Sequence, residues 1–305
     1  MVRLFSESER ASLYTYAPKS DNPELIRLHL KDQDNQKYLA RYDVTEDIAR
    51  MRDQMAFIND VLARATFDLE ITRDELEALE DQMHERGKER SDGDGRLRLQ
   101  DTVLYRVFND SSFKTGGRLY GGWWQTIPSR FRNRIRINRK RTVELDFRSL
   151  HPTMLYAKLG LEVPTDLYDV RVHPRSFGDG LTQSDYRTLV KRCFNAMLNA
   201  NHRIVHAPQD IDLQVWGLKW KQMVDAILEK HSPIADQFFM GRGLALQFDD
   251  SEIAINVMEG FAKKYGMVPL LPIHDSFICH HGYEKDVRQA LNLNGPVSAG
   301  MITNT

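Results

Sequence analysis

Hydrophobic residues recur at helical spacing between residues 45 and 87. Apolar side chains return every three or four residues, the period of one helix face, at Ile48, Met51, Met55, Ile58, Leu62, Ala65 and Leu69. Thr72 and Glu75 have the spacing of a capping box, so a second helix is expected to begin there and to end at Gly87. The pair could form a hairpin or one long bent helix. Its role could be to pack against a core or a partner, or to bind nucleic acid.

Two short apolar runs differ from these helices because each contains one aspartate. Residues 143–152 include Asp146, and residues 270–279 include Asp275. Runs this short and rich in Val, Leu, Ile and Phe predict buried strands. A carboxylate is costly to bury unless it is paired or binds a metal ion. Two such carboxylates on neighbouring strands could hold a pair of divalent cations, as two-metal phosphoryl transfer requires.

A third segment, residues 186–199, predicts a helix with two unlike faces, preceded by an N-terminal cap at residues 182–185. One face is apolar and suited to a core. The other face is expected to carry Arg187, Lys191, Phe194 and Asn195. Cations one turn apart repel each other, so they gain most if an anion lies between them. A triphosphate with its base against Phe194 would satisfy this face, and a solvated face is the alternative.

Composition narrows the class of protein. The 305 residues are 28% charged and 41% hydrophobic, which is typical of a soluble globular protein. No apolar run approaches the ~20 residues that span a bilayer, and the N-terminus lacks the apolar stretch of a signal peptide. The two cysteines, Cys193 and Cys279, indicate buried thiols in a reducing compartment. We therefore expect a cytoplasmic protein with no membrane partner.

The charge is unevenly spread along the chain. The net charge of −1 does not indicate nucleic-acid binding, but seven basic residues and no acidic one lie between Arg130 and Arg141. A local basic band of this kind can contact phosphates. A Gly-rich stretch at residues 115–122 precedes it, followed by Trp123 and Trp124, which could stack on bases or pack in a core.

The order of these segments resembles the family A polymerases, which comprise the bacterial repair-type DNA polymerases and the related single-subunit phage-type RNA polymerases. That family has a Thr-Gly-Arg loop, a Gln-Asn-Ile-Pro segment, Arg-rich residues, a first catalytic aspartate, an Arg-x-x-x-Lys helix and a final His-Asp motif. The similar residues here, within residues 114–280, are 115–118, 125–128, 134–136, Asp146, Arg187 with Lys191, and 274–276. Each motif alone is weak, but their shared order along the chain is specific.

The resemblance implies an α+β fold containing a right-hand polymerase palm, an antiparallel sheet with helices. The palm would occupy residues 101–305, with reduced fingers inserted at about residues 160–245. Residues 1–100 would form an N-terminal region with a long, thumb-like helical segment.

The resemblance also implies roles for residues. Asp146, Asp275 and the backbone carbonyl of Phe147 would hold two Mg²⁺ ions, with Mn²⁺ as an alternative metal. Arg187 and Lys191 would bind the incoming triphosphate and act in catalysis by stabilising its developing charge. The residues expected to hold primer and template backbones are Arg118, Gln125, His274 and the basic band, including Arg134 and Arg136.

Three departures from the family concern the nucleotide. Phe194 and Asn195 are shifted by one position relative to the family's Lys-x-x-Asn-Phe pattern, which leaves open which side chain stacks on the base. His151 stands where the DNA polymerases carry a glutamate that blocks the sugar 2′-hydroxyl, and a bulky side chain there favours deoxynucleotides. The last motif ends in Ser276, as in the RNA enzymes, so the choice of sugar stays open.

Together these features predict a small DNA polymerase, of a phage or mobile element in a bacterial or phage-infected cell. It would extend the 3′-end of a DNA primer-template, or of RNA, using nucleoside triphosphates. Nothing before residue 100 offers the spaced carboxylates of a proofreading exonuclease, and an accessory replication protein is an expected partner. A primase or single-subunit RNA polymerase on the same palm, or a catalytically inactive nucleic-acid-binding protein, are the alternatives.

Two other clusters are weaker candidates for chemistry. Cys279, His280 and His281 are adjacent and have no second cluster spaced for zinc. Asp249, Asp250 and Glu252 could add a metal ligand, although helix capping and solvated charge are the expected roles.

Overall fold

A computed structural model of the chain describes residues 24–32, 34, 36–90, 97–147, 149–170, 172, 181–294 and 302–304. The chain divides into two compact units. Unit 1 comprises Met1–Arg148 and Asp250–Thr305, and unit 2 comprises Ser149–Asp249. Within the described ranges, no helix combines the length and the apolar character needed to cross a membrane.

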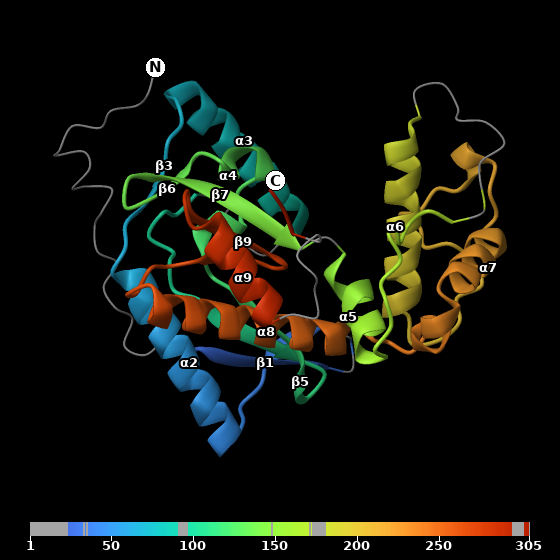
Figure 1. The fold of residues 1–305 in the computed structure, drawn as a ribbon, viewed down its shortest axis with the longest axis horizontal. Coiled ribbons are helices and arrows are strands. Elements are labelled where there is room, and N and C mark those ends of the chain that lie inside the picture. The colour runs from blue at the N-terminus through green and yellow to red at the C-terminus, as the bar shows by residue number, and fades with distance from the viewer. Residues whose placement is uncertain are drawn as a thin grey trace. The chain divides into compact units, whose positions relative to one another are not determined.

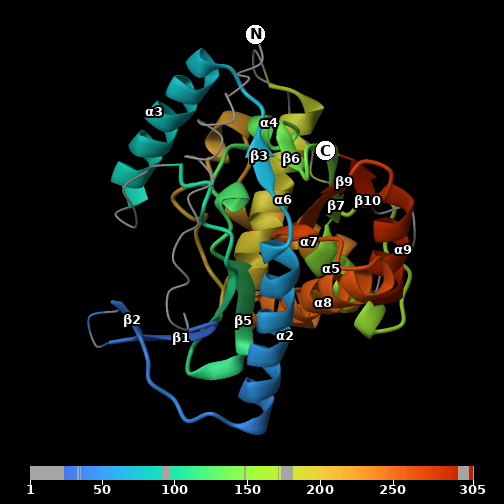
Figure 2. The ribbon, with the colours of Figure 1, turned by 90° about the vertical axis from the view of Figure 1, so that its left-hand side faces the viewer.

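The first sheet of unit 1 has the strand order β2-β1-β4-β5. Its strands are β1 (Ile26–Lys31), β2 (Lys37–Leu39), β4 (Tyr105–Asn109) and β5 (Ser112–Tyr120). Of these, β1, β2 and β5 are labelled in Figure 2. β1 and β4 run parallel, and the outer pairs are antiparallel. Along β4, Arg106 and Phe108 are buried whereas Tyr105 and Val107 are half-buried. This period of two gives the sheet one covered face and one more exposed face.

The second sheet of unit 1 is antiparallel, with the order β3-β6-β7-β9-β8 and with β10 paired to β7. Its strands are β3 (Phe67–Leu69), β6 (Ile135–Ile137), β7 (Lys140–Phe147), β8 (Leu271–Ile273), β9 (Ser276–His280) and β10 (Ile302–Asn304). Every residue of β8 and β9 is buried. Helix α9 (Glu284–Asn294) packs against β7 and β9 (Figure 1). The predicted α+β class, with helices and antiparallel sheet, is therefore confirmed.

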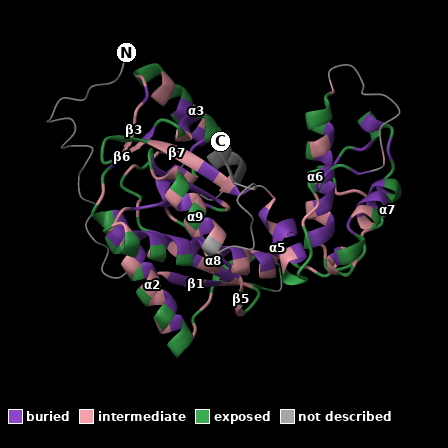
Figure 3. Ribbon diagram, viewed as in Figure 1, coloured by how far each residue is buried: buried purple, intermediate pink, exposed green. Residues whose placement is uncertain are grey.

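The segment over residues 45–87, predicted to form a helical hairpin or one long bent helix, also contains a strand. Helices α2 (Glu46–Ala63) and α3 (Arg73–Arg90) are separate, and β3 lies between them in sequence and pairs with β6. The predicted hairpin or bent helix is therefore wrong, because a strand this short does not disturb the hydrophobic period. The predicted face of α2 is confirmed, with buried and exposed positions alternating along it (Figure 3).

The predicted start of the second helix is confirmed, but its predicted end is wrong. The Thr72 N–H donates to Glu75 Oε2 at 2.8 Å, and the Glu75 N–H donates to Thr72 Oγ1 at 3.2 Å. α3 continues past Gly87 to Arg90. A glycine inside a helix costs only about 1 kcal/mol relative to alanine, so it does not by itself end the helix.

Unit 2 is helical over most of its described length. Its main elements are α5 (Leu150–Lys158), α6 (Gln183–Asn199), η2 (Gln214–Trp216), α7 (Trp220–Lys230) and η3 (Ser232–Gln237), and the first residues of α8 (Gly243–Lys264) also belong to it. The predicted cap of α6 is confirmed, since the Asp185 N–H donates to Thr182 Oγ1 at 3.2 Å and the Thr182 N–H donates to Asp185 Oδ2 at 2.9 Å. α6 and α7 pack together.

The buried His231 is expected to make unit 2 sensitive to acid. Its ring nitrogens lie 3.0 Å from Tyr156 Oη and 2.8 Å from Leu167 O, and desolvation lowers its pKa to about 4. An unfolded histidine titrates near 6.5. The unfolded chain therefore binds more protons between these values, and stability falls as the pH drops through this window, by up to about 1.4 kcal/mol per pH unit.

Denaturant unfolding at about pH 7 and about pH 4.5 measures this loss of stability. His231→Gln should reduce the pH dependence, and an unchanged dependence would contradict the assignment.

Candidate active site

Asp146 and Asp275 come together at one end of the second sheet. Asp146 is the second-last residue of β7 and lies opposite Ser276 of β9. Asp275 belongs to the turn between β8 and β9, and its carbonyl oxygen accepts a hydrogen bond from the Phe147 N–H at 3.1 Å. Both aspartates are half-buried. The sheet therefore places the two aspartates side by side, where solvent still reaches them.

The placement of Asp275 corrects the prediction of one strand over residues 270–279. That run forms two short strands joined by a two-residue turn, with Ile273 paired to Ser276. His274, the first turn residue, has a φ of +53°, and two-residue hairpin turns require positive φ. Asp275 thus lies at the tip of a hairpin instead of within a strand. This position reduces the cost of keeping its carboxylate charged.

A third carboxylate, Glu144, lies on the same side of β7 as Asp146 by the two-residue period of a strand. Glu144 Oε1 accepts hydrogen bonds from Ser276 Oγ at 2.6 Å and from Arg132 Nη1 at 3.1 Å. Arg132 therefore compensates a glutamate whose side chain is only 11% exposed. Sequence analysis missed Glu144, although the alternation Val-Glu-Leu-Asp was the signal. Ser276 serves here to join β7 to β9.

Arg118, within electrostatic reach of Asp275, forms an ion pair with an acid from α8. Its Nη2 lies 2.6 Å from Asp250 Oδ2, and its Nε donates to the same oxygen at 3.2 Å. The Asp250 side chain is almost completely buried. Burial alone would lower the pKa of Arg118, but the hydrogen bond and charge of Asp250, together with the charge of Asp275, raise it. Arg118 therefore stays a cation within the electrostatic reach of Asp275.

A second arginine, Arg106, was not found by sequence analysis and ties the glycine-rich strand β5 to α8. It is fully buried, and its Nε donates to Gly117 O at 2.9 Å. Its Nη2 lies 2.9 Å from Ser251 Oγ and 2.7 Å from Glu252 Oε1. Gly117 has a φ of +78°, and a Cβ there would lie 2.9 Å from Arg106 Nη2, which explains the glycine. The sequence does contain a signal for this residue, because Arg106 occupies a position of β4 whose side chain faces the core.

These contacts correct the expected roles of the acidic residues on α8. Asp250 and Glu252 form ion pairs with arginines from β5 and β4, and Asp249 pairs with Lys158 within unit 2. Asp250 is therefore neither a helix cap nor a solvated charge, whereas Asp249 and Glu252 are paired but keep carboxylates that solvent reaches. A buried arginine deprived of its acid would be strongly destabilising, so the acids of unit 1 hold its first sheet to α8.

The segment after β5, η1 (Trp123–Gln125), supports β8. Both tryptophans are buried, so the core alternative for them is correct. Trp124 Nε1 and Gln125 Nε2 each donate to Pro272 O at 3.1 Å, and Gln125 Nε2 also donates to Leu119 O at 3.0 Å. Gln125 thus joins β5 to β8, next to the turn that carries Asp275. We interpret Gln125 as a positioning residue, whereas sequence analysis expected it to contact nucleic acid.

The basic band between residues 130 and 141 is divided by its partners. Arg132, Arg134 and Arg136 pair with Glu144, Glu75 and Glu70, and Arg130 Nη2 donates to Gln82 Oε1 at 2.8 Å. By contrast, Arg139, Lys140 and Arg141 are exposed at the β6–β7 turn and form no ion pair with a described residue. Since Arg134 and Arg136 already face acids, the uncompensated cations of the band lie at this turn.

In unit 2, α6 differs from the prediction at Phe194. This ring is fully buried, with its centroid 4.9 Å from that of Phe238 and 5.0 Å from that of His231. The expected placement of Phe194 on the exposed face, ready to stack on a base, is therefore wrong. The buried stripe of α6 is wider than one helix face because residues after α7 cover it. Asn195, the next residue, is half-buried.

The two cations of α6 have different surroundings. Arg187 Nη2 lies 3.3 Å from Asp166 Oδ1, and the Arg187 guanidinium carbon lies 5.0 Å from the centroid of the Tyr168 ring. Lys191 is exposed and forms no ion pair with a described residue. Arg187 thus already has an anion, whereas Lys191 is available to bind one.

His151 lies in the first turn of α5 and is half-buried. The residue before this helix, Ser149, has a φ of +59°, in the left-handed region that residues other than glycine seldom occupy. Ser149 is the N-cap residue of α5, the helix that carries His151.

Asp146, Asp275 and the carbonyl of Phe147 would offer only oxygen ligands, which suit hard cations such as Mg²⁺. Magnesium is commonly bound by one or two carboxylates together with substrate phosphates and water, so two aspartates fit this chemistry. Among the described residues, no group of three or more His, Cys, Asp or Glu side chains could hold a metal ion.

Comparison of the chain with models of known protein families and with curated protein sequences gave no match.

Proposed function

We propose that the chain is a template-directed nucleotidyltransferase with a palm built from the second sheet of unit 1. The observation that carries this proposal is the backbone contact between Phe147 and Asp275, which sets Asp146 on β7 beside the hairpin turn of β8 and β9. A strand and an adjoining hairpin, each presenting one aspartate, can supply the pair of carboxylates that two-metal phosphoryl transfer uses.

Within this class we propose a DNA polymerase without its own proofreading activity. Its reaction joins the 3′-oxygen of a primer to the α-phosphorus of a nucleoside triphosphate, breaks the bond to pyrophosphate and releases the hydroxyl proton. Asp146, Asp275 and the Phe147 carbonyl would hold the divalent cations. When bound, these cations would activate the 3′-hydroxyl and offset charge on the leaving pyrophosphate.

Residues of both units have roles in this proposal. Lys191, assisted by Arg187, would neutralise the triphosphate. Arg118, His274 and the cations of the β6–β7 turn would contact nucleic-acid backbones, and His151 would exclude the 2′-hydroxyl. Unit 2 corresponds to reduced fingers, and α2 and α3 to a thumb-like region. The role of Lys191 in neutralising the triphosphate is supported by its exposed charge, which forms no ion pair with a described residue.

Primer extension by the purified chain tests this function. The panel combines deoxynucleotides or ribonucleotides with DNA or RNA templates, each with and without a primer. We expect Mg²⁺-dependent addition of deoxynucleotides to a primed template. Ribonucleotide addition without a primer would instead identify a primase or RNA polymerase. Binding of nucleic acid without any incorporation would identify an inactive binding protein and contradict the proposal.

A further inference from the structure

A row of planar side chains crosses the first sheet of unit 1 and ends at the candidate active site. The row consists of Arg27, Tyr105, Tyr120 and His274. The Arg27 guanidinium carbon lies 3.4 Å from the centroid of the Tyr105 ring. Tyr105 and Tyr120 are stacked across β4 and β5, with centroids 6.4 Å apart and planes 29° apart. Tyr120 meets the His274 ring edge-on at 6.1 Å.

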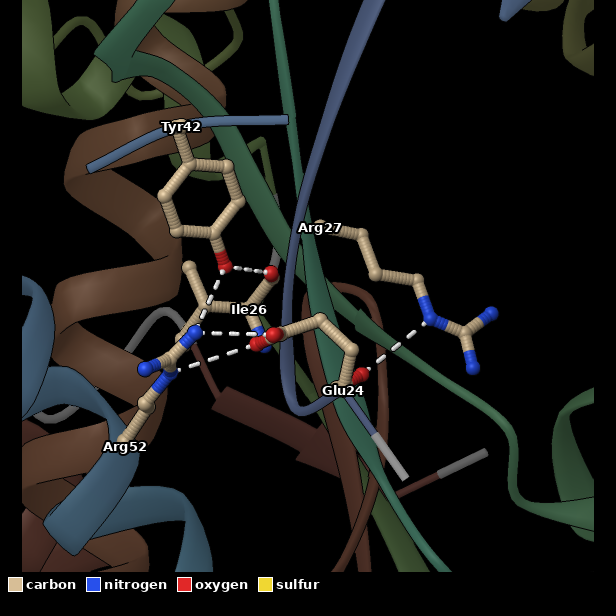
Figure 4. A network of polar contacts seen from close by, with 5 residues as sticks. All are labelled: Glu24, Ile26, Arg27, Tyr42 and Arg52. Carbon is tan, nitrogen blue, oxygen red and sulfur yellow. Dashed lines mark hydrogen bonds and ion pairs between the residues drawn. The ribbon is translucent and has the colours of Figure 1, made fainter. Parts of the chain in front are cut away.

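The first member of the row is fixed by a polar network at the start of β1 (Figure 4). Arg27 Nε donates to Glu24 O at 3.2 Å, and the Glu24 carboxylate lies 2.7 Å from Arg52 Nη2. The Tyr42 hydroxyl donates to Ile26 O and also lies 3.4 Å from Arg52 Nη2. The terminal nitrogens of Arg27 extend away from this network and contact none of the residues drawn (Figure 4). They remain available to an anion.

The last members of the row are fixed by the contacts that join the two sheets. Gln125 connects Leu119, the neighbour of Tyr120, to Pro272, two residues before His274. Tyr120 and His274 are exposed, and Arg27 and Tyr105 are half-buried. The two tyrosine rings are thus partly open to solvent, and their hydroxyls form no hydrogen bond with a described residue.

We propose that this row binds single-stranded nucleic acid, with a base stacked on the exposed Tyr120 ring while Arg27, which Tyr105 holds in place, contacts a phosphate. Rigid aromatic rings beside a cation are the usual means of binding unpaired strands, because every base offers a face to stack on. A duplex hides those faces, so it does not fit the row. This inference rests on the proposed function, because the row ends at His274, next to Asp275, where the proposed function places the reaction.

Fluorescence anisotropy with a labelled single-stranded oligodeoxynucleotide tests the row, with a chelator present and no nucleotide added. Tyr105→Ala and Tyr120→Ala should each weaken binding by about 5-fold to 100-fold. Tyr120→Phe should bind like the wild type, because the ring and not the hydroxyl is used. Tyr38→Ala, at a tyrosine of β2 in the same sheet that is 49% exposed, is the matched control and should have no effect. Arg27→Gln should reduce the salt dependence by about one phosphate contact.

Two further measurements separate the outcomes. A cross-strand tyrosine pair also stabilises a sheet, so the first measurement compares the thermal unfolding of each variant. The second measures binding by Tyr120→Leu, which keeps an apolar side chain but has no ring. If Tyr105→Ala and Tyr120→Ala bind the single strand as tightly as the wild type, the row does not bind it. If the two variants lose as much affinity for a duplex of the same length, the row is not specific for single strands, and the proposal is likewise contradicted. A chain that binds through the row but adds no nucleotide contradicts only the polymerase proposal. A chain that extends primers with unaltered binding in these variants contradicts only the row.

Discussion

Asp146→Asn and Asp275→Asn are each expected to slow nucleotide incorporation by about 1,000-fold or more. Removing one carboxylate takes away a charged metal ligand, and metal-dependent stabilisation of a phosphoryl-transfer transition state is worth several kcal/mol. Asp53→Asn is the matched control, because Asp53 is an exposed aspartate of α2 in the same unit. Single-turnover primer extension with saturating Mg²⁺ measures the rate.

The stability of the same variants separates a chemical role from a structural one. An asparagine keeps the size and shape of the aspartate side chain at these half-buried positions, so each variant should fold with a melting temperature close to that of the wild type. A variant that loses activity together with its fold would say nothing about chemistry. A folded variant that incorporates nucleotides at the wild-type rate would show that the aspartate assignment is wrong.

Lys191→Ala is expected to produce the second-largest loss, about 100-fold to 1,000-fold in the rate of incorporation. Removal of one preorganised group that stabilises transition-state charge typically costs this much. Lys191 is exposed on α6, so the substitution should not disturb folding. Arg242→Ala, at another exposed cation of unit 2, serves as the control. Equal rates for Lys191→Ala and Arg242→Ala would exclude a role for Lys191 in the reaction.

Arg187→Ala is expected to differ from Lys191→Ala because of its neighbours. Arg187 pairs with Asp166 and lies against Tyr168, so its removal also leaves an acid without its partner. Burial alone would raise the pKa of Asp166, but hydrogen bonds from the Tyr168 N–H and from Arg187, together with the charges of Arg187 and Lys230, lower it. Part of any loss in Arg187→Ala would therefore come from unit 2 itself, which makes Lys191 the cleaner test.

The sequence predicted those parts of the fold that have a strong local signal. The period of α2 and the caps at Thr72 and Thr182 were read correctly, because they depend on residues a few positions apart. The two runs around Asp146 and Asp275 were recognised because a carboxylate among apolar residues is conspicuous. These local signals were enough to select the residues that the second sheet brings together.

The missed features depend on contacts between distant segments. β3 and β10 are three-residue strands that exist only through their pairing with β6 and β7. The burial of Phe194 depends on Phe238, which comes far later in the chain. Arg106 and Glu144 were overlooked because their partners, on α8 and β9, are likewise remote in sequence. Local periodicity carries no information about such partners.

The most direct test of the central claim, a metal centre held by Asp146 and Asp275 together, is Mn²⁺ binding followed by electron paramagnetic resonance. The titration uses the chain bound to a primer-template with a non-hydrolysable nucleoside triphosphate, in the wild type and in Asp146→Asn/Asp275→Asn. We expect the wild type to bind about two Mn²⁺ ions and the double variant to lose at least one of them. Equal numbers of bound ions in the folded wild type and the folded double variant would contradict the claim.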